Sequence, residues 1–268
     1  MKEDLTISII QTELAWENKE ANFKHFDELI NAIEIDTDLI VLPEMFSTGF
    51  SMNAENLYDK PEGKTLKWMH NHAKNKNAVI TGSAIIKDGG NYCNRLFFVE
   101  PNGDYKTYDK KHLFTLAGEN KHYTAGQDKL ILDYKGWKIC PMICYDLRFP
   151  VWIRNQEDYH LLIFVANWPA MRVKAWDTLL QARAIENMAY TIGVNRVGED
   201  GNGFPYCGHS AIYDALGKKI TTNLFEKAFV ETKTLSKNDL IETREKLGFL
   251  KDRDVFDLNH ARSTSNRF

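Results

Sequence analysis

Hydrophobic and polar positions follow two different periods in the first third of the chain. Residues 5–14 alternate between apolar and polar side chains, and 38–43 and 78–85 are short apolar runs, so we predict three strands. Helices are predicted across 17–35 and at about 64–76. The first of these is indicated by apolar residues at 3.6-residue spacing: Phe23, Phe26, Leu29, Ile30 and Ile33. This alternation of strands and helices is typical of a layered α/β fold.

The remainder of the chain adds hairpins and further buried strands. Residues 91–100 and 105–110 flank the turn Pro101-Asn102-Gly103-Asp104, which predicts a hairpin. The other predicted elements are strands at 137–144, 161–167 and 190–197, a helix at 174–188, a hairpin of 207–214 with 218–222, and a closing helix at 236–247. About ten strands and three or four main helices favour two stacked sheets with helices outside.

Neither a linker nor a repeat interrupts these elements. We therefore expect one domain over residues 1–268, with its core at about 5–245 and a polar tail after Asp252.

Composition and charge narrow the range of partners. The 268 residues carry 34 Lys and Arg against 37 Asp and Glu, a net charge of −3, and contain no polybasic run. This balance argues against nucleic acid or an anionic membrane as partner and favours a small molecule. The longest apolar run, 161–166, is far too short to span a bilayer. The first residues lack the pattern of a secretory signal and the four cysteines fit reduced thiols, so we expect a cytoplasmic protein.

Two chemically versatile residues follow predicted buried strands. Cys144 ends the strand at 137–144, where a thiol can be exposed at the sheet edge and the following backbone N–H groups can face an oxyanion. Glu44 follows the run 38–43, where partial burial raises the pKa of a carboxyl group toward the range of a general base. Each also has an ordinary structural interpretation, Cys144 as a buried apolar residue and Glu44 as a capping or solvated loop residue.

Lysines and histidines supply further candidates. Lys110 and Lys111 end the second strand of the hairpin, and an ammonium group beside a thiol favours the thiolate and stabilises an anionic intermediate. Because strand side chains alternate, only one lysine can face a given pocket, and periodicity does not choose between them. His112, His122 and His209 are candidates because a Cys-His pair is the common route to an activated thiol.

Other chemistries find less support in the pattern. Cys140 and Cys144 share a strand face, but no second pair at ligand spacing completes a metal site. A Gly-rich phosphate loop of standard spacing is also missing. Arg172 and Trp168 lie just past the strand at 161–167, where a guanidinium can bind a carboxylate with two hydrogen bonds, although Arg172 could also be an ordinary surface residue.

Three segments occur in an order that is more specific than any one of them: Leu42-Pro43-Glu44, Tyr108-Asp109-Lys110-Lys111-His112-Leu113-Phe114 and Ile143-Cys144-Tyr145-Asp146-Leu147-Arg148-Phe149-Pro150. They resemble the nitrilase superfamily of carbon–nitrogen hydrolases, whose Glu-Lys-Cys triad follows the same order. The resemblance covers about residues 5–245 and extends to Gly118-Glu119 with Tyr123-Thr124-Ala125-Gly126, to Ala182-Arg183-Ala184-Ile185-Glu186-Asn187 and to Gly208-His209-Ser210. It implies an α/β fold of four layers, an α-β-β-α sandwich with two mixed sheets, and pairing into a homodimer or larger homo-oligomer.

The resemblance also implies roles for single residues. Cys144 resembles the nucleophile of the family, Glu44 its general base, and Lys110, rather than Lys111, the lysine that stabilises the transition state. Glu119 matches a second glutamate that positions the substrate and the lysine, and His112 is implied to be structural. The chemistry of the triad requires no metal and no cofactor.

Within the superfamily, the chain is similar to the omega-amidase branch in three segments: Glu44-Met45-Phe46-Ser47-Thr48-Gly49-Phe50, Asn167-Trp168-Pro169-Ala170, and Asn195-Arg196-Val197-Gly198 followed by Asp200-Gly201-Asn202-Gly203. Enzymes of that branch hydrolyse the terminal amide of 2-oxoglutaramate or 2-oxosuccinamate. A 2-oxo carboxylate requires a cation away from the triad, for which Arg172 is the candidate by chemistry. Tyr145, Phe114 and Trp168 are expected to complete the substrate site.

Three alternatives stay open at this point. Another enzyme of the superfamily would cleave an aliphatic amide, a carbamoyl group or a nitrile. A thiol hydrolase would pair its cysteine with His209. A non-catalytic binding or scaffold module would keep the same residues dispersed in space.

Overall fold

The computed structural model describes residues 4–222 and 226–258. Within them, the first of two large sheets has six strands. Strand order in the first sheet is β13-β1-β2-β3-β4-β5, in which β1, β2 and β3 are parallel, and β13, β4 and β5 each pair antiparallel with their neighbours. The bounds are β1 Asp4–Gln11, β2 Leu39–Val41, β3 Val79–Asp88, β4 Asn91–Val99, β5 Tyr105–Asp109 and β13 Phe229–Ser236.

The second sheet has five strands in the order β12-β9-β8-β7-β6. Its three central strands are parallel and its two edge strands antiparallel. The bounds are β6 Leu132–Tyr134, β7 Trp137–Ile143, β8 Leu161–Val165, β9 Tyr190–Val194 and β12 Ala211–Tyr213. A small antiparallel pair, β10 (Val197–Glu199) with β11 (Pro205–Cys207), stands apart from both sheets.

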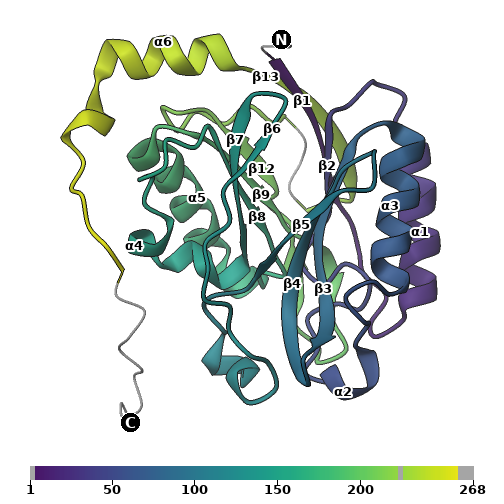
Figure 1. Cartoon of the computed structure of the whole chain (residues 1–268). Coiled ribbons are helices and arrows are strands. Elements are labelled where there is room, and N and C mark those ends of the chain that lie inside the picture. Colours follow the sequence, from purple (N-terminus) through teal and green to yellow (C-terminus); the bar gives the residue numbers. More distant parts are fainter. Residues whose placement is uncertain (1–3, 223–225, 259–268) are drawn as a thin grey trace, which may run out of the picture.

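Helices cover the outer faces of the two sheets, so that the layers run α-β-β-α (Figure 1). Helices α1 (Lys19–Asn31) and α3 (Lys64–Lys76) lie against the first sheet, and α4 (Pro150–Ile153) and α5 (Val173–Asn187) lie against the second. The short α2 (Ala54–Leu57) precedes α3, and α6 (Lys237–Leu247) follows β13. The predicted four-layer sandwich with two mixed sheets is confirmed.

Alternation along the short strand β2 shows how the sequence produces these layers. Leu39 and Val41 are fully buried in the cluster that fills the space between the sheets. Ile40 points the opposite way, into the cluster shared with Phe26 of α1 and Met69 of α3. Because both faces of the strand are covered, all three positions are apolar, as expected for a parallel strand in a buried sheet.

The predicted strand at 190–197 is divided in the structure. It becomes β9 and β10, which do not belong to the same sheet. Between them lie Asn195 and Arg196, where Asn195 Oδ1 accepts hydrogen bonds from the backbone N–H groups of Trp168 and Arg196. Asn195 thus fixes a turn within an otherwise apolar run.

The predicted hairpin of 207–214 with 218–222 is shorter in the structure, where only its part next to the turn is paired. Residues 207–214 are broken at Gly208 and His209, whose φ angles of 75° and 62° cannot continue a strand. Residues 218–220 return antiparallel to 212–214, because Asp214 N–H donates to the Lys218 carbonyl group at 3.0 Å and Ile220 N–H to the Ile212 carbonyl group at 2.8 Å, with a bridge between Lys219 and Tyr213. Strands β6 and β13 were not predicted. The polar tail predicted after Asp252 is described as far as Leu258, and the rest of it lies outside the described residues.

Elsewhere the predicted boundaries are close. The helix predicted at 64–76 matches α3. The one predicted at 17–35 is shorter at both ends: it begins at Lys19, because Asn18 caps α1 by accepting a hydrogen bond from the Ala21 N–H group, and it ends at Asn31. Over the described part of the chain, helices of the length and hydropathy needed to cross a membrane are absent.

Close packing of α5 on the second sheet generates a stability prediction. A Cβ atom on Gly193 of β9 would lie 2.4 Å from Leu180 Cδ1 and 2.7 Å from Trp176 Cζ2. Trp176 cannot move away freely, because its indole N–H donates to the His209 carbonyl group at 2.8 Å. We expect Gly193→Ala to lower the free energy of unfolding by about 1–3 kcal/mol, measured by urea denaturation.

The control is the double variant Gly193→Ala/Leu180→Ala, in which the obstructing methyl groups are removed. Its destabilisation should be smaller than the sum of the two single effects. If the two single losses of unfolding free energy simply add in the double variant, the contact between α5 and β9 does not limit the size of residue 193.

Candidate active site

Four polar side chains from different elements meet where the strands of both sheets end. Glu44 follows β2, Lys110 follows β5, Cys144 follows β7 and Asn167 follows β8. The carboxyl ends of parallel strands lie at one edge of a sheet, so residues distant in sequence come together there. Of the residues predicted from the sequence, Glu44, Lys110, Cys144 and Glu119 are brought into this single buried cluster.

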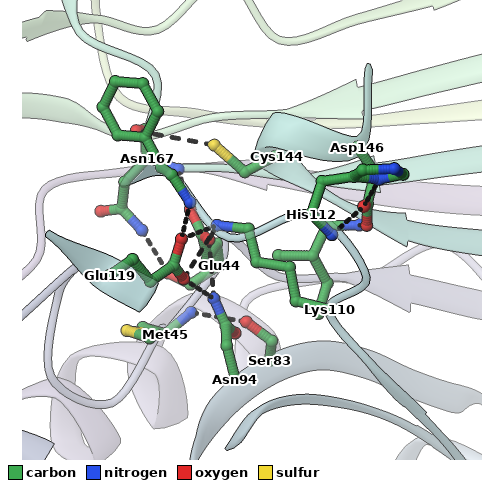
Figure 2. A network of polar contacts seen from close by, with 12 residues as sticks. Glu44, Met45, Ser83, Asn94, Lys110, His112, Glu119, Cys144, Asp146 and Asn167 are labelled. Atoms are coloured by element: carbon green, nitrogen blue, oxygen red, sulfur yellow. Dashed lines mark hydrogen bonds and ion pairs between the residues drawn. The ribbon is translucent and has the colours of Figure 1, made fainter. Parts of the chain in front are cut away.

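Lys110 lies at the centre of the cluster between two carboxylates. Its Nζ atom is 2.9 Å from Glu44 Oε1 and 3.0 and 3.1 Å from the two oxygens of Glu119. All three side chains are removed from solvent. Figure 2 shows the amine directed at both carboxylates, with the Cys144 side chain reaching into the same cluster. Lys111 instead bonds Gln127 at the surface, so the register of the chain after β5 turns Lys110 inward.

Amide groups fix the orientation of the Glu44 carboxylate. Asn94 of β4 donates to Oε1 at 2.8 Å, and the Asn167 backbone N–H donates to Oε2 at 2.8 Å. The Asn167 side chain also donates to the Glu44 carbonyl group at 2.6 Å. Each carboxylate oxygen therefore has a fixed donor, and the group cannot rotate without losing a hydrogen bond.

Glu119 is held in a comparable way by the loop that carries it. The Phe114 N–H group donates to Glu119 Oε2 at 2.5 Å. Two short 3₁₀ helices, η1 (Thr115–Ala117) and η2 (Glu119–Lys121), are joined by Gly118, whose φ of 77° permits the turn. A backbone bond from Gly126 to the Lys110 carbonyl group anchors the following segment. A Cβ atom on Gly126 would lie 2.2 Å from the Asp109 carbonyl oxygen, which explains the glycine that ends the Tyr-Thr-Ala-Gly motif.

Electrostatics keep the lysine charged. Burial opposes the charge of the Lys110 amine, but Glu119 and Glu44 outweigh it, so the pKa of Lys110 is raised above its ordinary value. Burial raises the pKa of Glu119, which Lys110 lowers in part.

The thiol, in contrast, is held in its neutral form. Burial, followed by the negative charge of Glu44, raises the pKa of Cys144 well above that of a free cysteine, and Lys110 offsets only part of this. A neighbouring ammonium group is thus not sufficient to favour the thiolate here, because burial and the two carboxylates outweigh its effect on the pKa of Cys144. A base must remove the proton when the sulfur reacts.

A tight turn directs Cys144 into the cluster. Its φ is 45°, in the left-handed region that residues other than glycine adopt at a cost of about 1–2 kcal/mol. The turn joins β7 to the 3₁₀ helix η3 (Cys144–Arg148) and leaves Sγ 3.9 Å from the Asn167 carbonyl oxygen. The strain lies at the residue predicted to be the nucleophile, and strained residues of this kind cluster at functional sites.

A buried carboxylate ties the lysine segment to the cysteine turn. Asp146 accepts hydrogen bonds from the Tyr108 hydroxyl group at 2.8 Å and from the Ile143 N–H group at 3.1 Å through Oδ2. Through Oδ1 it accepts from the His112 backbone at 3.0 Å and pairs with the His112 ring at 2.8 Å. His112 also stacks on Phe149 with ring centroids 3.6 Å apart, which agrees with a structural histidine.

The cluster opens into a pocket of about 670 Å³. The predicted substrate-binding residues Phe114, Tyr145, Trp168 and Arg172 all contribute to its wall, as do Lys110 and Cys144. The Arg172 guanidinium lies 5.1 Å from the centre of the Phe114 ring. A volume of this size suits a small molecule.

The remaining histidine candidates lie elsewhere. His209 pairs with Asp177 of α5 at 2.9 Å and is not part of the pocket wall. His122 is exposed. Sequence reasoning missed Asn94 and the orienting role of Asn167. The available signal was a polar residue facing inward from an apolar strand, since Asn94 is fully buried in β4.

Comparison with known proteins gives the class to which this fold and site belong. A family model described as carbon-nitrogen hydrolase matches residues 6–245, and the chain belongs to this family. It is 50 % identical over 215 residues to the protein named omega-amidase YafV of Yersinia enterocolitica, covering 80 % of this chain and 83 % of that protein. It is 44 % identical over 254 residues to omega-amidase YafV of Escherichia coli K12, covering 95 % and 98 % respectively.

A solved structure agrees with the fold over nearly the whole chain. A CN-hydrolase superfamily protein of Xanthomonas campestris, which carries an arsenic adduct in its active site, superposes with a TM-score of 0.93 at 40 % identity. The superposition covers 96 % of this chain and 99 % of that protein.

The Asp146 bridge generates a second prediction. Because each of its oxygens accepts from two donors, the amide of Asp146→Asn would place an NH₂ group against donors. We expect a loss of about 2–4 kcal/mol in the free energy of unfolding, together with a lower kcat, since the lysine segment and the cysteine turn lose their common anchor. Chemical denaturation and steady-state kinetics would measure the two effects. Asp133→Asn, at an exposed position of β6, is the matched control, and equal effects of both variants would contradict the assignment.

Proposed function

We propose that the chain is an omega-amidase, which releases ammonia from the terminal amide of small 2-oxo acid amides such as 2-oxoglutaramate and 2-oxosuccinamate. The observation that carries the proposal is the buried Glu44–Lys110–Glu119 cluster beside a strained cysteine, in a pocket that also presents arginine. The omega-amidase names of relatives that are 44–50 % identical support the choice of reaction.

In the proposed first step, Glu44 accepts the proton of the Cys144 thiol while the sulfur attacks the amide carbon. The carbonyl oxygen becomes an oxyanion, which the Lys110 ammonium group and the Tyr145 backbone N–H group stabilise. The raised pKa of the thiol supports a base-assisted attack over a preformed thiolate.

The tetrahedral intermediate then collapses. Protonated Glu44 gives its proton to the amide nitrogen, the C–N bond breaks, ammonia leaves and a thioester to Cys144 remains. Glu44 next accepts a proton from water, whose oxygen attacks the thioester carbon. The C–S bond breaks, the thiol recovers its proton and the acid is released. The two fixed donors on Glu44 support one carboxylate serving both half-reactions.

Arg172 is proposed to bind the carboxylate of the substrate. Its side chain is partly buried on the pocket wall and lies against the face of Phe114, an arrangement that leaves the guanidinium edge for a ligand.

We further propose a cytoplasmic homodimer or larger homo-oligomer. The four cysteines, all among the described residues, are free thiols, as is usual in a reducing compartment. Val151 of α4 and Ile185 of α5 are 55 % and 49 % exposed on helices of the same layer, which supports pairing through this side.

The substrate assignment is tested by ammonia release. We expect 2-oxoglutaramate and 2-oxosuccinamate to be hydrolysed with a kcat/KM at least about a hundredfold above glutamine and asparagine, because an α-ammonium group would lie close to the arginine. Faster release from an uncharged aliphatic amide, a carbamoyl compound or a nitrile would instead assign another activity of the superfamily.

Side-chain roles are tested by paired substitutions. Lys110→Ala and Cys144→Ala should each lower kcat/KM by about a thousandfold or more, since members of a catalytic unit act together. Lys111→Ala and His209→Ala should retain most of the activity. Circular dichroism and denaturation would establish that Lys110→Ala is folded. Activity that is lost in Lys111→Ala and kept in Lys110→Ala would refute the assignment of the lysine, and loss in His209→Ala would favour a Cys-His hydrolase.

A further inference from the structure

A second arginine on the pocket wall has no hydrogen-bond or ion-pair partner among the described residues. Arg148, the last residue of η3, is partly buried, and its guanidinium carbon lies 4.9 Å from the centre of the Trp168 ring. Across residues 4–222 and 226–258, no hydrogen bond or ion pair reaches its side chain. Arg172 is in a similar position, because its guanidinium bonds only the Met171 sulfur within the same part of the chain.

The other charges of the wall are already engaged. Lys110 is neutralised by Glu44 and Glu119. Glu17 accepts hydrogen bonds from the Ser51 hydroxyl and Asn53 amide groups. The Asp200 carboxylate accepts from the Tyr206 hydroxyl group and from backbone N–H groups. Within the described residues, the two arginines are therefore the cations of the wall that form no ion pair, while the oxygens of Glu17 and Asp200 are occupied by neutral donors. Partly buried guanidinium groups of this kind suit an anionic ligand with several acceptor oxygens.

One tryptophan holds both arginines relative to the catalytic cluster. The Trp168 face carries the Arg148 guanidinium, and its indole N–H donates to the Arg172 carbonyl group at 2.8 Å. Trp168 is 3 % exposed and follows Asn167, whose backbone N–H bonds Glu44. The buried Trp168 side chain thus fixes how far the two guanidinium groups lie from Cys144. A fixed distance of this kind lets a site select substrates by their length.

We infer that Arg148 is a specificity-determining residue, which together with Arg172 binds the 2-oxo carboxylate end of the substrate. The inference rests on the proposed function. A 2-oxo carboxylate presents three acceptor oxygens at one end, so two guanidinium groups can share them. An α-amino acid amide presents an ammonium group instead of the oxo oxygen, and two nearby guanidinium groups repel it. The arginine pair therefore selects 2-oxo acid amides over glutamine or asparagine.

The test compares Arg148→Met with Lys111→Met on three amides of similar length. Lys111 is a matched control, because its amine also lies over an indole ring, 5.1 Å from that of Trp152, but outside the pocket wall. The substrates are 2-oxoglutaramate, glutaramate, which lacks the oxo group, and pentanamide, which lacks oxo group and carboxylate. Arg172→Met serves as the reference for loss of the carboxylate contact.

For Arg148→Met we expect kcat/KM on 2-oxoglutaramate to fall by about 10- to 100-fold, mainly through KM, as for the loss of a charge-assisted hydrogen bond. Activity on pentanamide should stay within about threefold, and the preference for 2-oxoglutaramate over glutamine should shrink. Lys111→Met should change neither. An equal loss on all three amides would mean that Arg148 acts only through the cysteine turn, and an unchanged profile would mean that it contacts no substrate. Either result would overturn the inference.

A binding measurement separates this inference from the proposed reaction. Calorimetry with 2-oxoglutarate on the Cys144→Ala protein should show an affinity that Arg148→Met weakens by a similar factor, with thermal unfolding confirming that both variants are folded. If the wild-type protein does not hydrolyse 2-oxoglutaramate, the proposed function fails, but an arginine-dependent affinity would still support the anion site. If 2-oxoglutarate binds equally well with and without Arg148, the inference fails while the proposed function stands.

Discussion

The structure of the site depends on one interaction, the burial of a lysine ammonium group between two carboxylates. Placing charges in a protein interior costs several kcal/mol for each ion unless partners and hydrogen bonds compensate. Here the compensation comes from Glu44, Glu119, Asn94 and the backbone at Phe114 and Asn167. Loss of Lys110 would leave two buried carboxylates without a cation, and loss of an amide donor would leave a buried carboxylate oxygen unsatisfied, so the groups depend on one another.

That requirement explains why the site is assembled from both sheets. Glu44, Lys110 and Asn94 come from the first sheet and the segments at its strand ends, whereas Cys144 and Asn167 follow strands of the second. The apolar cluster between the sheets fixes their separation. Packing energy distributed over the whole sandwich thus holds a small polar cluster in place, and Asp146 adds a direct link between the lysine segment and the cysteine turn.

Much of the fold follows from local pattern, and the exceptions have physical causes. Strands with two apolar faces and helices with one apolar stripe were predicted correctly in kind. Strand β13 escaped prediction because it has few apolar residues: Thr232 and Thr234 bond the hydroxyl groups of Ser8 and Thr6 across the strand pair, and Leu235 is its one buried apolar residue. The breaks at Asn195 and His209 depend on side-chain bonds and backbone angles that a hydropathy pattern does not encode.

The same distinction applies to the site. The order of the motifs was sufficient to select Glu44, Lys110 and Cys144 as candidates. Asn94 lies in a strand whose sequence gives no sign of its partner across the sheet. The direction of the pKa shift of Cys144 could not be predicted from the sequence either. It depends on burial and on the distances of the sulfur from two carboxylates and one ammonium group, which only the structure gives.

The raised pKa of the Cys144 thiol also affects how readily the resting enzyme is oxidised. Peroxide and other mild oxidants attack the thiolate form of cysteine, so a thiol kept neutral by burial and by Glu44 is a poor target for them. The sulfur becomes a strong nucleophile only while a carbonyl group is present to accept its electrons. The charge balance that makes the attack base-assisted therefore also disfavours oxidation of the resting thiol.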